Sequence, residues 1–202
     1  ILDHLRRQAY LTRGVTIHFR DERERAEFPK YSFYFEGGVA SYVKHLNRNA
    51  TAVHPSVFYA SKALDSIHVE IALQYTDTYK ESIFTFANNI HTGEGGMHLT
   101  GFKSALTRTL NNYAREKSMV KEKDENLTAE DVREGITAIV SVKVPEPQFE
   151  GQTKAKLGNA EVRGAVESLF GEAFAQWLEE NPGDGNPIIA KCSLAQRARN
   201  AA

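Results

Sequence analysis

The segment Gly151–Gly158, with the sequence GQTKAKLG, holds the side chains best suited to bind an anion. Gln152 offers an amide that donates hydrogen bonds, and Lys154 offers a full positive charge. In an extended loop, side chains two residues apart project to the same side, so these two residues could grip one phosphate or carboxylate. On spacing alone the plain interpretation is a polar surface loop, and anion binding is the alternative.

A second stretch, Gly93–Gly96, has the glycine content of a phosphate-binding loop. It lacks the spacing of both the P-loop and the dinucleotide-binding fingerprint, which favours a turn between a strand and a helix. His91 and His98 flank the stretch, but no third ligand stands within reach by spacing, so no metal site is predicted. The scattered Ser, His and Asp residues show no nucleophile-elbow pattern, so a hydrolase triad has no support.

Basic side chains gather on the segment that follows, where apolar residues recur at helical spacing over residues 99–117. Arg108 and Arg115 share one face of this predicted helix, and Lys103 lies about 140° around the axis from Arg108. The plain interpretation is a solvated helix side. The alternative is contact with nucleic-acid phosphates.

The elements that must position these residues follow from hydrophobic periodicity. Helices are predicted at 1–13, 39–46, 99–117, 159–180 and from 187, with strands at 15–20, 31–36, 57–60, 67–76, 82–87 and 136–144. Asn159 is a predicted N-cap, and Thr128 with Asp131 forms a predicted capping box. Because strands and helices do not alternate strictly, we expect an α+β fold: one mostly antiparallel sheet with helices on one face.

Composition narrows the class of protein. The chain has 202 residues and a formal net charge of -1, so its overall charge does not indicate a nucleic-acid-binding protein. Its single cysteine, Cys192, excludes a disulfide framework and fits a reducing, cytoplasmic compartment. No run approaches the ~18 apolar residues of a membrane span. Both ends look like interrupted helices, so we expect a piece of a longer protein.

Several motifs occur in an order typical of one family. They are YFEGG at 34–38, EGGMHLTGF at 94–102, ALTR at 105–108, DVREG at 131–135 and VPEPQFEGQTK at 144–154. With these motifs the chain resembles the second, transducer domain of the B subunit of type IIA topoisomerases, the family of bacterial DNA gyrase and topoisomerase IV. The likeness covers nearly all residues, and several motifs in order are more specific than any one of them.

The resemblance implies a fold and a division of the chain. The fold would be a ribosomal-protein-like one that contains a left-handed βαβ crossover and is followed by a long C-terminal helix. Residues 1–13 would be the tail of a helix from the preceding ATPase domain. Residues 14–182 would form the transducer domain, and residues 183–202 the helix that leads to the DNA-cleavage domain.

The resemblance also implies a function, that of an ATP-hydrolysing DNA topoisomerase in the full-length protein, with this fragment alone inactive. ATP and Mg²⁺ would be bound mainly by the absent N-terminal domain. Gln152 and Lys154 match the family's switch loop, whose residues contact the γ-phosphate, with Lys154 in a catalytic role. Lys103 matches a position, often arginine, that faces the cavity for DNA, and Arg108 is expected to face DNA as well.

The partners implied are double-stranded DNA, the gyrase A subunit in an A2B2 heterotetramer, and a second B subunit on ATP binding, with no membrane. Two alternatives stay open: the B-type subunit of topoisomerase IV, and a DNA-binding module in which the loop is incidental. The PEPQFEG run at 145–151 and LGN at 157–159 favour gyrase. A salt titration of duplex binding would separate the transducer from the DNA-binding module.

Overall fold

A mixed five-stranded sheet lies at the centre of the computed structural model, which describes residues 1–201. Its strands are β3 (Phe58–Leu64), β4 (Ile67–Tyr75), β5 (Ser82–Ala87), β6 (Ile90–His91) and β7 (Ile136–Lys143), in the order β3–β4–β7–β5–β6. The pairs β3–β4, β4–β7 and β5–β6 are antiparallel, and β5–β7 is parallel. The predicted α+β class is confirmed.

The two inner antiparallel strands, β4 and β7, form the best-covered part of the sheet. They pair from His68 opposite Lys143 to Tyr75 opposite Ile136. Every residue of β7 except Lys143 is buried. A strand covered on both faces is mostly apolar instead of alternating between apolar and polar residues, which explains the apolar run that predicted a strand over residues 136–144.

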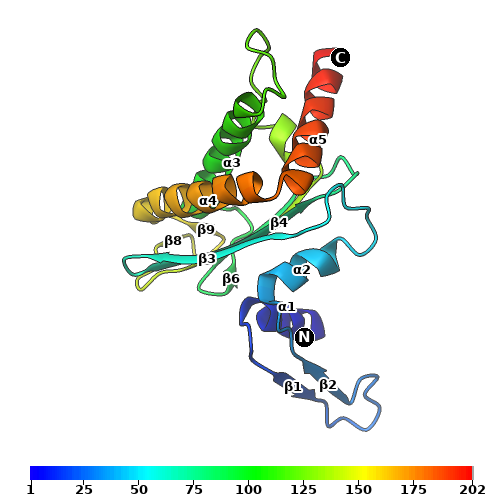
Figure 1. Ribbon diagram of the computed structural model, residues 1–202. Helices are drawn as coiled ribbons and strands as arrows, with labels where there is room; N and C mark the ends of the chain where they lie inside the picture. Colours follow the sequence, from blue (N-terminus) through cyan, green and yellow to red (C-terminus); the bar gives the residue numbers. More distant parts are fainter. Residues whose placement is uncertain (202) are drawn as a thin grey trace.

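Two long helices, α3 (Met97–Glu116) and α4 (Ala160–Glu180), pack on each other over one face of the sheet (Figure 1). An aromatic cluster joins α4 to β3: the ring centroids of Phe58 and Phe174 lie 5.1 Å apart, and those of Phe170 and Phe174 lie 5.2 Å apart. Phe102 of α3 joins this cluster, with its ring centroid 4.8 Å from that of Phe170. This layer contains most of the core and holds α3 and α4 against the sheet.

The opposite face is covered by α2 (Gly38–Leu46), so the prediction of helices on one face only is wrong. Val39 and Val43 of α2 are fully buried in a second apolar cluster together with Ala72 of β4 and Ile139 of β7. Side chains alternate across a strand, and these two strand residues present an apolar patch on the second face. That patch needs cover, which α2 provides.

The N-terminal residues form a small unit next to α2, at the lower end of Figure 1. It comprises α1 (Leu2–Leu11) and the hairpin of β1 (Ile17–Arg20) and β2 (Lys30–Phe33). The ring of Tyr10 stacks on Phe35 at 3.6 Å and on Tyr42 at 4.7 Å. A boundary after residue 13 falls between α1 and β1 inside this packed unit, and the domain division stays a prediction.

The parallel pair β5–β7 is joined by a connection that contains α3 and a short 3-10 helix, η1 (Asp131–Arg133). This is the βαβ unit in which the resemblance places a left-handed crossover. The hand of the crossover stays a prediction. The predicted capping box at the start of η1 is confirmed: the Thr128 N–H donates to Asp131 Oδ2 at 2.8 Å, and the Asp131 N–H donates to Thr128 Oγ1 at 3.2 Å.

The last helix, α5 (Pro182–Ala201), begins five residues before the predicted start at 187, because proline is well suited to the first turn of a helix. Its near end is buried. Asp184 accepts hydrogen bonds from the Ser56 N–H at 2.8 Å and from His54 Nδ1 at 3.0 Å. The Tyr75 N–H donates to His54 Nε2, which leaves the ring proton on Nδ1.

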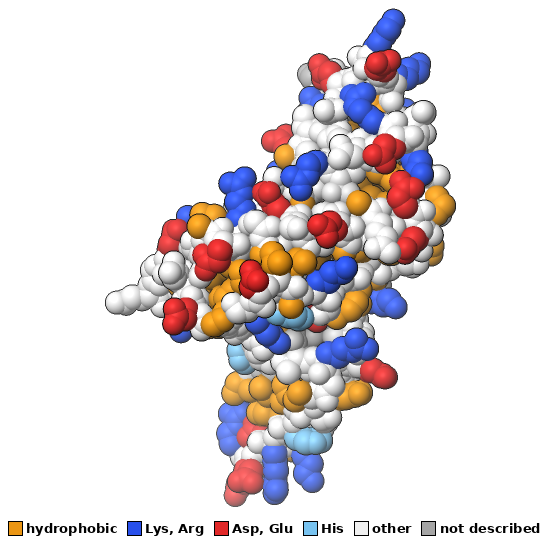
Figure 2. Space-filling model, turned by 60° about the vertical axis from the view of Figure 1, so that its left-hand side comes forward, with side chains coloured by type: hydrophobic (Ala, Val, Ile, Leu, Met, Phe, Trp, Pro, Cys, Tyr) orange, Lys and Arg blue, Asp and Glu red, His pale blue; other side chains and the backbone are white. Residues whose placement is uncertain are grey.

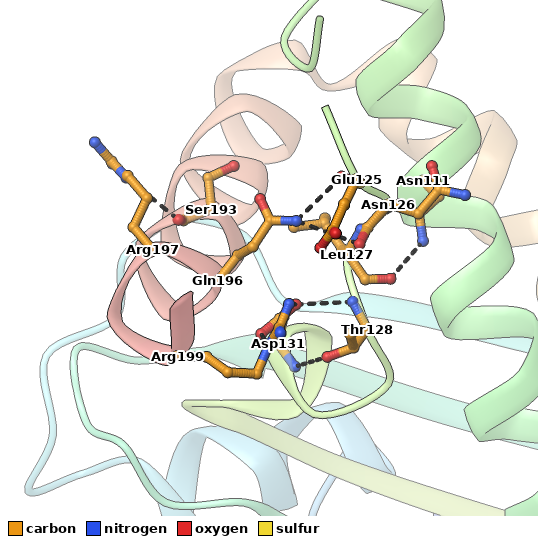
Figure 3. A network of polar contacts seen from close by, with 10 residues as sticks. All are labelled: Asn111, Glu125, Asn126, Leu127, Thr128, Asp131, Ser193, Gln196, Arg197 and Arg199. Carbon is orange, nitrogen blue, oxygen red and sulfur yellow. Dashed lines mark hydrogen bonds and ion pairs between the residues drawn. The ribbon is translucent and has the colours of Figure 1, made fainter. Parts of the chain in front are cut away.

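The far half of α5 is held by a polar network (Figure 3). Arg199 donates to both carboxylate oxygens of Asp131, at 3.0 and 3.2 Å. Gln196 Nε2 donates to the carbonyl oxygens of Glu125 and Asn126, at 3.1 and 3.2 Å. The helix is thus fixed to η1 and to the loop after α3. Among the helices within residues 1–201, none has the length and apolarity to cross a bilayer.

Candidate functional site

The predicted anion-binding segment is the tip of a small hairpin rather than an extended loop. Strands β8 (Phe149–Glu150) and β9 (Lys156–Leu157) pair antiparallel, and residues 151–154 make the turn between them. Gly151 and Lys154 both have positive φ, of 76° and 54°. The expectation of extended backbone here is wrong, because the antiparallel pairing makes the chain reverse its direction within a few residues.

The predicted pair, Gln152 and Lys154, lies exposed at this tip. Within residues 1–201 neither side chain has a hydrogen-bond or ion-pair partner. The ammonium of Lys154 lies 5.7 Å from the centre of the Phe149 ring, a weak cation–π contact. The tip therefore presents one cation and one amide to solvent, a donor set that suits a phosphate or carboxylate oxygen.

The other lysine of the hairpin, Lys156, is differently placed. Its ammonium lies 2.9 Å from Glu150 Oε2, directly across the two strands. The hydrogen bond to Glu150 raises the pKa of Lys156. The hairpin thus has one neutralised lysine and one lysine whose charge faces solvent.

The glycine-rich stretch 93–96 connects β6 to α3, which confirms the predicted strand-to-helix turn. Sequence reasoning missed that it also seats the hairpin. The Glu94 N–H donates to the Ala155 carbonyl at 2.9 Å, and the Leu157 N–H donates to the Gly95 carbonyl at 3.0 Å. Gly96 has a φ of 131°, and a Cβ there would overlap the backbone carbonyl of Leu157. Only glycine allows β9 to approach this closely.

Asn159 stands at the N-cap of α4, as predicted, but its side chain does not cap the helix. Its Oδ1 accepts from the Gln148 N–H at 2.6 Å, and its Nδ2 donates to the Glu146 carbonyl at 3.1 Å and to Glu161 Oε1 at 2.8 Å. The side chain therefore ties the segment before β8 to the first turn of α4. No sequence signal distinguishes this use of asparagine from a capping one.

The two predicted DNA-facing residues lie apart on α3. Lys103 Nζ is 3.3 Å from Glu81 Oε1, and Arg133 Nε is 3.2 Å from the other oxygen of the same carboxylate. Arg108 is exposed in a groove between α3 and α4 whose lining includes Glu167 and Glu172. On the face drawn in Figure 2, acidic and basic side chains are interspersed, without a single basic stripe. DNA contact by these residues stays a prediction.

The two histidines that flank the glycine-rich stretch do not form a metal site. His98 is fully buried, with Nε2 2.9 Å from Thr92 Oγ1, and burial lowers its pKa to about 4. His91 lies against the Phe86 ring at 5.4 Å. Over residues 1–201, no group of three His, Cys, Asp or Glu side chains is arranged to hold a metal ion.

Comparison with known proteins gives consistent matches. A family model described as DNA gyrase B matches residues 38–202. The DNA gyrase B subunit of Clostridium acetobutylicum is 54% identical over 98% of this chain, and that of Bacillus mycoides is 52% identical over 98%. The chain spans 31% of the first relative and 48% of the second, so it matches a part of each.

Solved structures with this fold include an ATPase-domain fragment. The 43K ATPase domain of Thermus thermophilus gyrase B superposes with a TM-score of 0.89 at 38% identity, over 99% of this chain and 53% of that one. The topoisomerase IV ATP-binding domain of Francisella tularensis superposes with a TM-score of 0.81 at 25% identity, over 98% of this chain and 52% of that one. The matched region lies inside fragments described as ATPase or ATP-binding domains, a broader description than the expected transducer domain.

Proposed function

The chain belongs to the DNA gyrase B family, and from this premise we propose that it is the transducer region of the B subunit of an ATP-dependent type II DNA topoisomerase. On this proposal ATP and Mg²⁺ are bound mainly by the preceding domain of a longer, cytoplasmic subunit. Its partners are duplex DNA, the gyrase A subunit in an A2B2 assembly, and a second B subunit when ATP binds.

The observation that carries this proposal is the exposed tip of the hairpin, with Gln152 and Lys154 facing solvent. Phosphoryl transfer depends on positioning and on stabilisation of charge. The Lys154 ammonium supplies both when it meets a γ-phosphate held by the neighbouring domain, and Gln152 adds a neutral donor. A hydrogen bond to a charged group contributes about 1.5–3 kcal/mol.

The same contact reports the state of the nucleotide. When the γ-phosphate leaves after hydrolysis, the tip loses its anchor, and the arrangement favoured by ATP is no longer stabilised. Strand β9 leads from the tip to α4 and is hydrogen-bonded to the turn before α3, and α4 leads to α5. These helices would carry the change towards the DNA-cleavage domain and so couple hydrolysis to strand passage and supercoiling.

The test uses the two lysines of the hairpin in the full-length subunit. Lys154→Ala should lower the rate of ATP hydrolysis by about 10²–10³-fold, as loss of a transition-state charge donor does. Lys156→Ala is the matched control, because that ammonium is already paired with Glu150, and it should change the rate by no more than about twofold. Equal rates for the two variants would refute the sensor role of Lys154.

A further inference from the structure

The hairpin is fixed at its base and free at its tip. On one side, β9 is tied by backbone hydrogen bonds to the glycine-rich turn before α3. On the other side, the segment before β8 is tied to α4 by the side chain of Asn159. Residues 152–154, between these two attachments, are exposed. Apart from the chain itself and the hydrogen bond at the base of the hairpin, the tip is therefore attached to the rest of the protein by the backbone hydrogen bonds of β9 and by one side-chain amide.

Asn159 is well suited to transmit a force on the tip. It is 2% exposed, and both ends of its amide are satisfied. The residue belongs to α4 as its N-cap, yet two of its three side-chain hydrogen bonds go to the segment before β8. The Gly158 N–H, next to it in the chain, closes the base of the hairpin by donating to the Gln148 carbonyl at 2.7 Å.

We propose that Asn159 is the positioning residue that makes the hairpin and the first turn of α4 move as one body. A displacement of the tip is then delivered to α4 instead of being absorbed at the base of the hairpin. The inference rests on the proposed function for the cause of the displacement, which is the binding and loss of a phosphate at the tip. The mechanical coupling itself is a property of this chain without nucleotide.

The coupling predicts concerted opening when the amide is removed. Asn159→Ala deletes the bonds to Gln148 and Glu146, and two neutral hydrogen bonds correspond to about a 10- to 100-fold change in an opening equilibrium. Gln148 must exchange faster in any case, because its own partner is lost. The amides of Leu157 and Gly158 show whether the hairpin opens as a unit, because the variant keeps the carbonyl groups to which they donate.

Amide hydrogen exchange of the 202-residue chain measures this directly. Asn159→Ala should accelerate exchange at Leu157 and Gly158 by about 10- to 100-fold, while amides of β4 stay protected. Asn111→Ala is the matched control. Its side chain clamps another loop in the same way, accepting from the Leu127 N–H at 2.8 Å and donating to the Leu127 carbonyl at 3.0 Å. That control should open its own loop and leave the hairpin protected.

Faster exchange at Gln148 alone would overturn the inference, because the hydrogen bonds of Asn159 would then stabilise only their own partners and not the hairpin as a whole. If β4 also loses protection in Asn159→Ala, the milder Asn159→Asp decides. It keeps an acceptor for Gln148, loses both donors and adds a charge beside Glu161. It should accelerate Leu157 and Gly158 with β4 protected, and unchanged exchange at both residues would overturn the inference.

A second measurement separates this inference from the proposed function. In the full-length subunit, Asn159→Ala should keep ATP hydrolysis within about tenfold of the wild type, while strand passages per ATP fall by at least about threefold. An unchanged ratio would overturn the transmission to α4. An ATP hydrolysis rate in Lys154→Ala equal to that of Lys156→Ala would instead refute the sensor role, and the exchange result would stand.

Discussion

The contact between Arg199 and Asp131 gives the sharpest prediction about how α5 is held. Arg199→Ala removes two hydrogen bonds, at 3.0 and 3.2 Å, from a carboxylate that is 2% exposed. The Arg199 side chain itself is 36% exposed. The variant should weaken the attachment of the far half of α5 to η1 without disturbing the sheet.

The magnitude follows from the surroundings of the two charges. A hydrogen bond to a charged group is worth about 1.5–3 kcal/mol, and the partial exposure of Arg199 reduces this through solvent screening. Asp131 keeps the Thr128 N–H as a donor in the variant, so its charge is not left without a partner. We expect a loss of about 1–2 kcal/mol, which in a chain of this size lowers Tm by about 2–8 °C.

Thermal unfolding followed by circular dichroism measures this loss, with Arg197→Ala as the control. Arg197 lies two residues earlier on the same helix, is exposed, and donates only to the Ser193 carbonyl of its own helix at 3.3 Å. Its removal should change stability by less than about 0.5 kcal/mol. A common shift for both variants would mean that the Asp131 contact contributes nothing.

The effect also depends on pH. Burial raises the pKa of Asp131, but the hydrogen bonds from Arg199 and Thr128 outweigh it, and the net pKa lies below its usual value. The unfolded chain therefore takes up the proton first as the pH falls. The stabilisation is complete above about pH 4 and is lost at lower pH. The gap in Tm between wild type and Arg199→Ala should therefore narrow below about pH 4.

Three further predictions concern the seat of the hairpin, a buried histidine and the charge near α3. Gly96→Ala should lower the free energy of unfolding, measured with urea, by about 2–5 kcal/mol, because its Cβ would overlap the backbone of β9. Gly14 also has positive φ but has open space around it, so Gly14→Ala should lower that free energy by only about 1–2 kcal/mol. Burial lowers the pKa of His98 to about 4, so the unfolded state binds a proton at this histidine before the folded state does. The free energy of unfolding should therefore fall as the pH drops from about 6.5 to about 4, and it should fall less steeply in His98→Gln. Since Lys103 is paired with Glu81, the chain should bind duplex DNA weakly. Glu81→Gln should make the slope of log K against log salt concentration, measured by fluorescence anisotropy, steeper by up to about 1.

Local signals in the sequence were sufficient for elements that local chemistry determines. The capping box at Thr128 and Asp131 forms as predicted, since its two partners lie three residues apart. The apolar run that became β7 and the stripe that became α4 also appear where expected, because their burial reaches all along each element. In these cases the sequence neighbourhood already contains the physical cause.

Features that depend on partners distant in sequence were missed or misread. The patch on the second face of the sheet, covered by α2, joins residues 39–43 to Ala72 and Ile139, and periodicity does not say which sheet face a helix covers. Asn159 is a preferred residue type for an N-cap, yet its side chain bonds to Glu146 and Gln148, more than ten residues earlier. The pairing of Lys103 with Glu81 likewise depends on the fold and not on spacing.

The two ends of α5 are held by different kinds of contact, and on the proposed function this difference bears on how the helix responds to the nucleotide. At the near end Asp184 is buried against His54 and Ser56, whereas the far half combines the buried residues Cys192 and Ala195 with the more exposed contacts of Gln196 and Arg199. A ligand shifts an equilibrium only by its differential affinity for the two states. On the proposed function, a phosphate contact of about 1.5–3 kcal/mol at the hairpin tip is comparable to the roughly 1–2 kcal/mol expected for the Arg199 contact alone. On the proposed function, such a phosphate contact would therefore be enough to shift the Arg199 contact, while the buried part of α5, from Asp184 to Ala195, would stay in place.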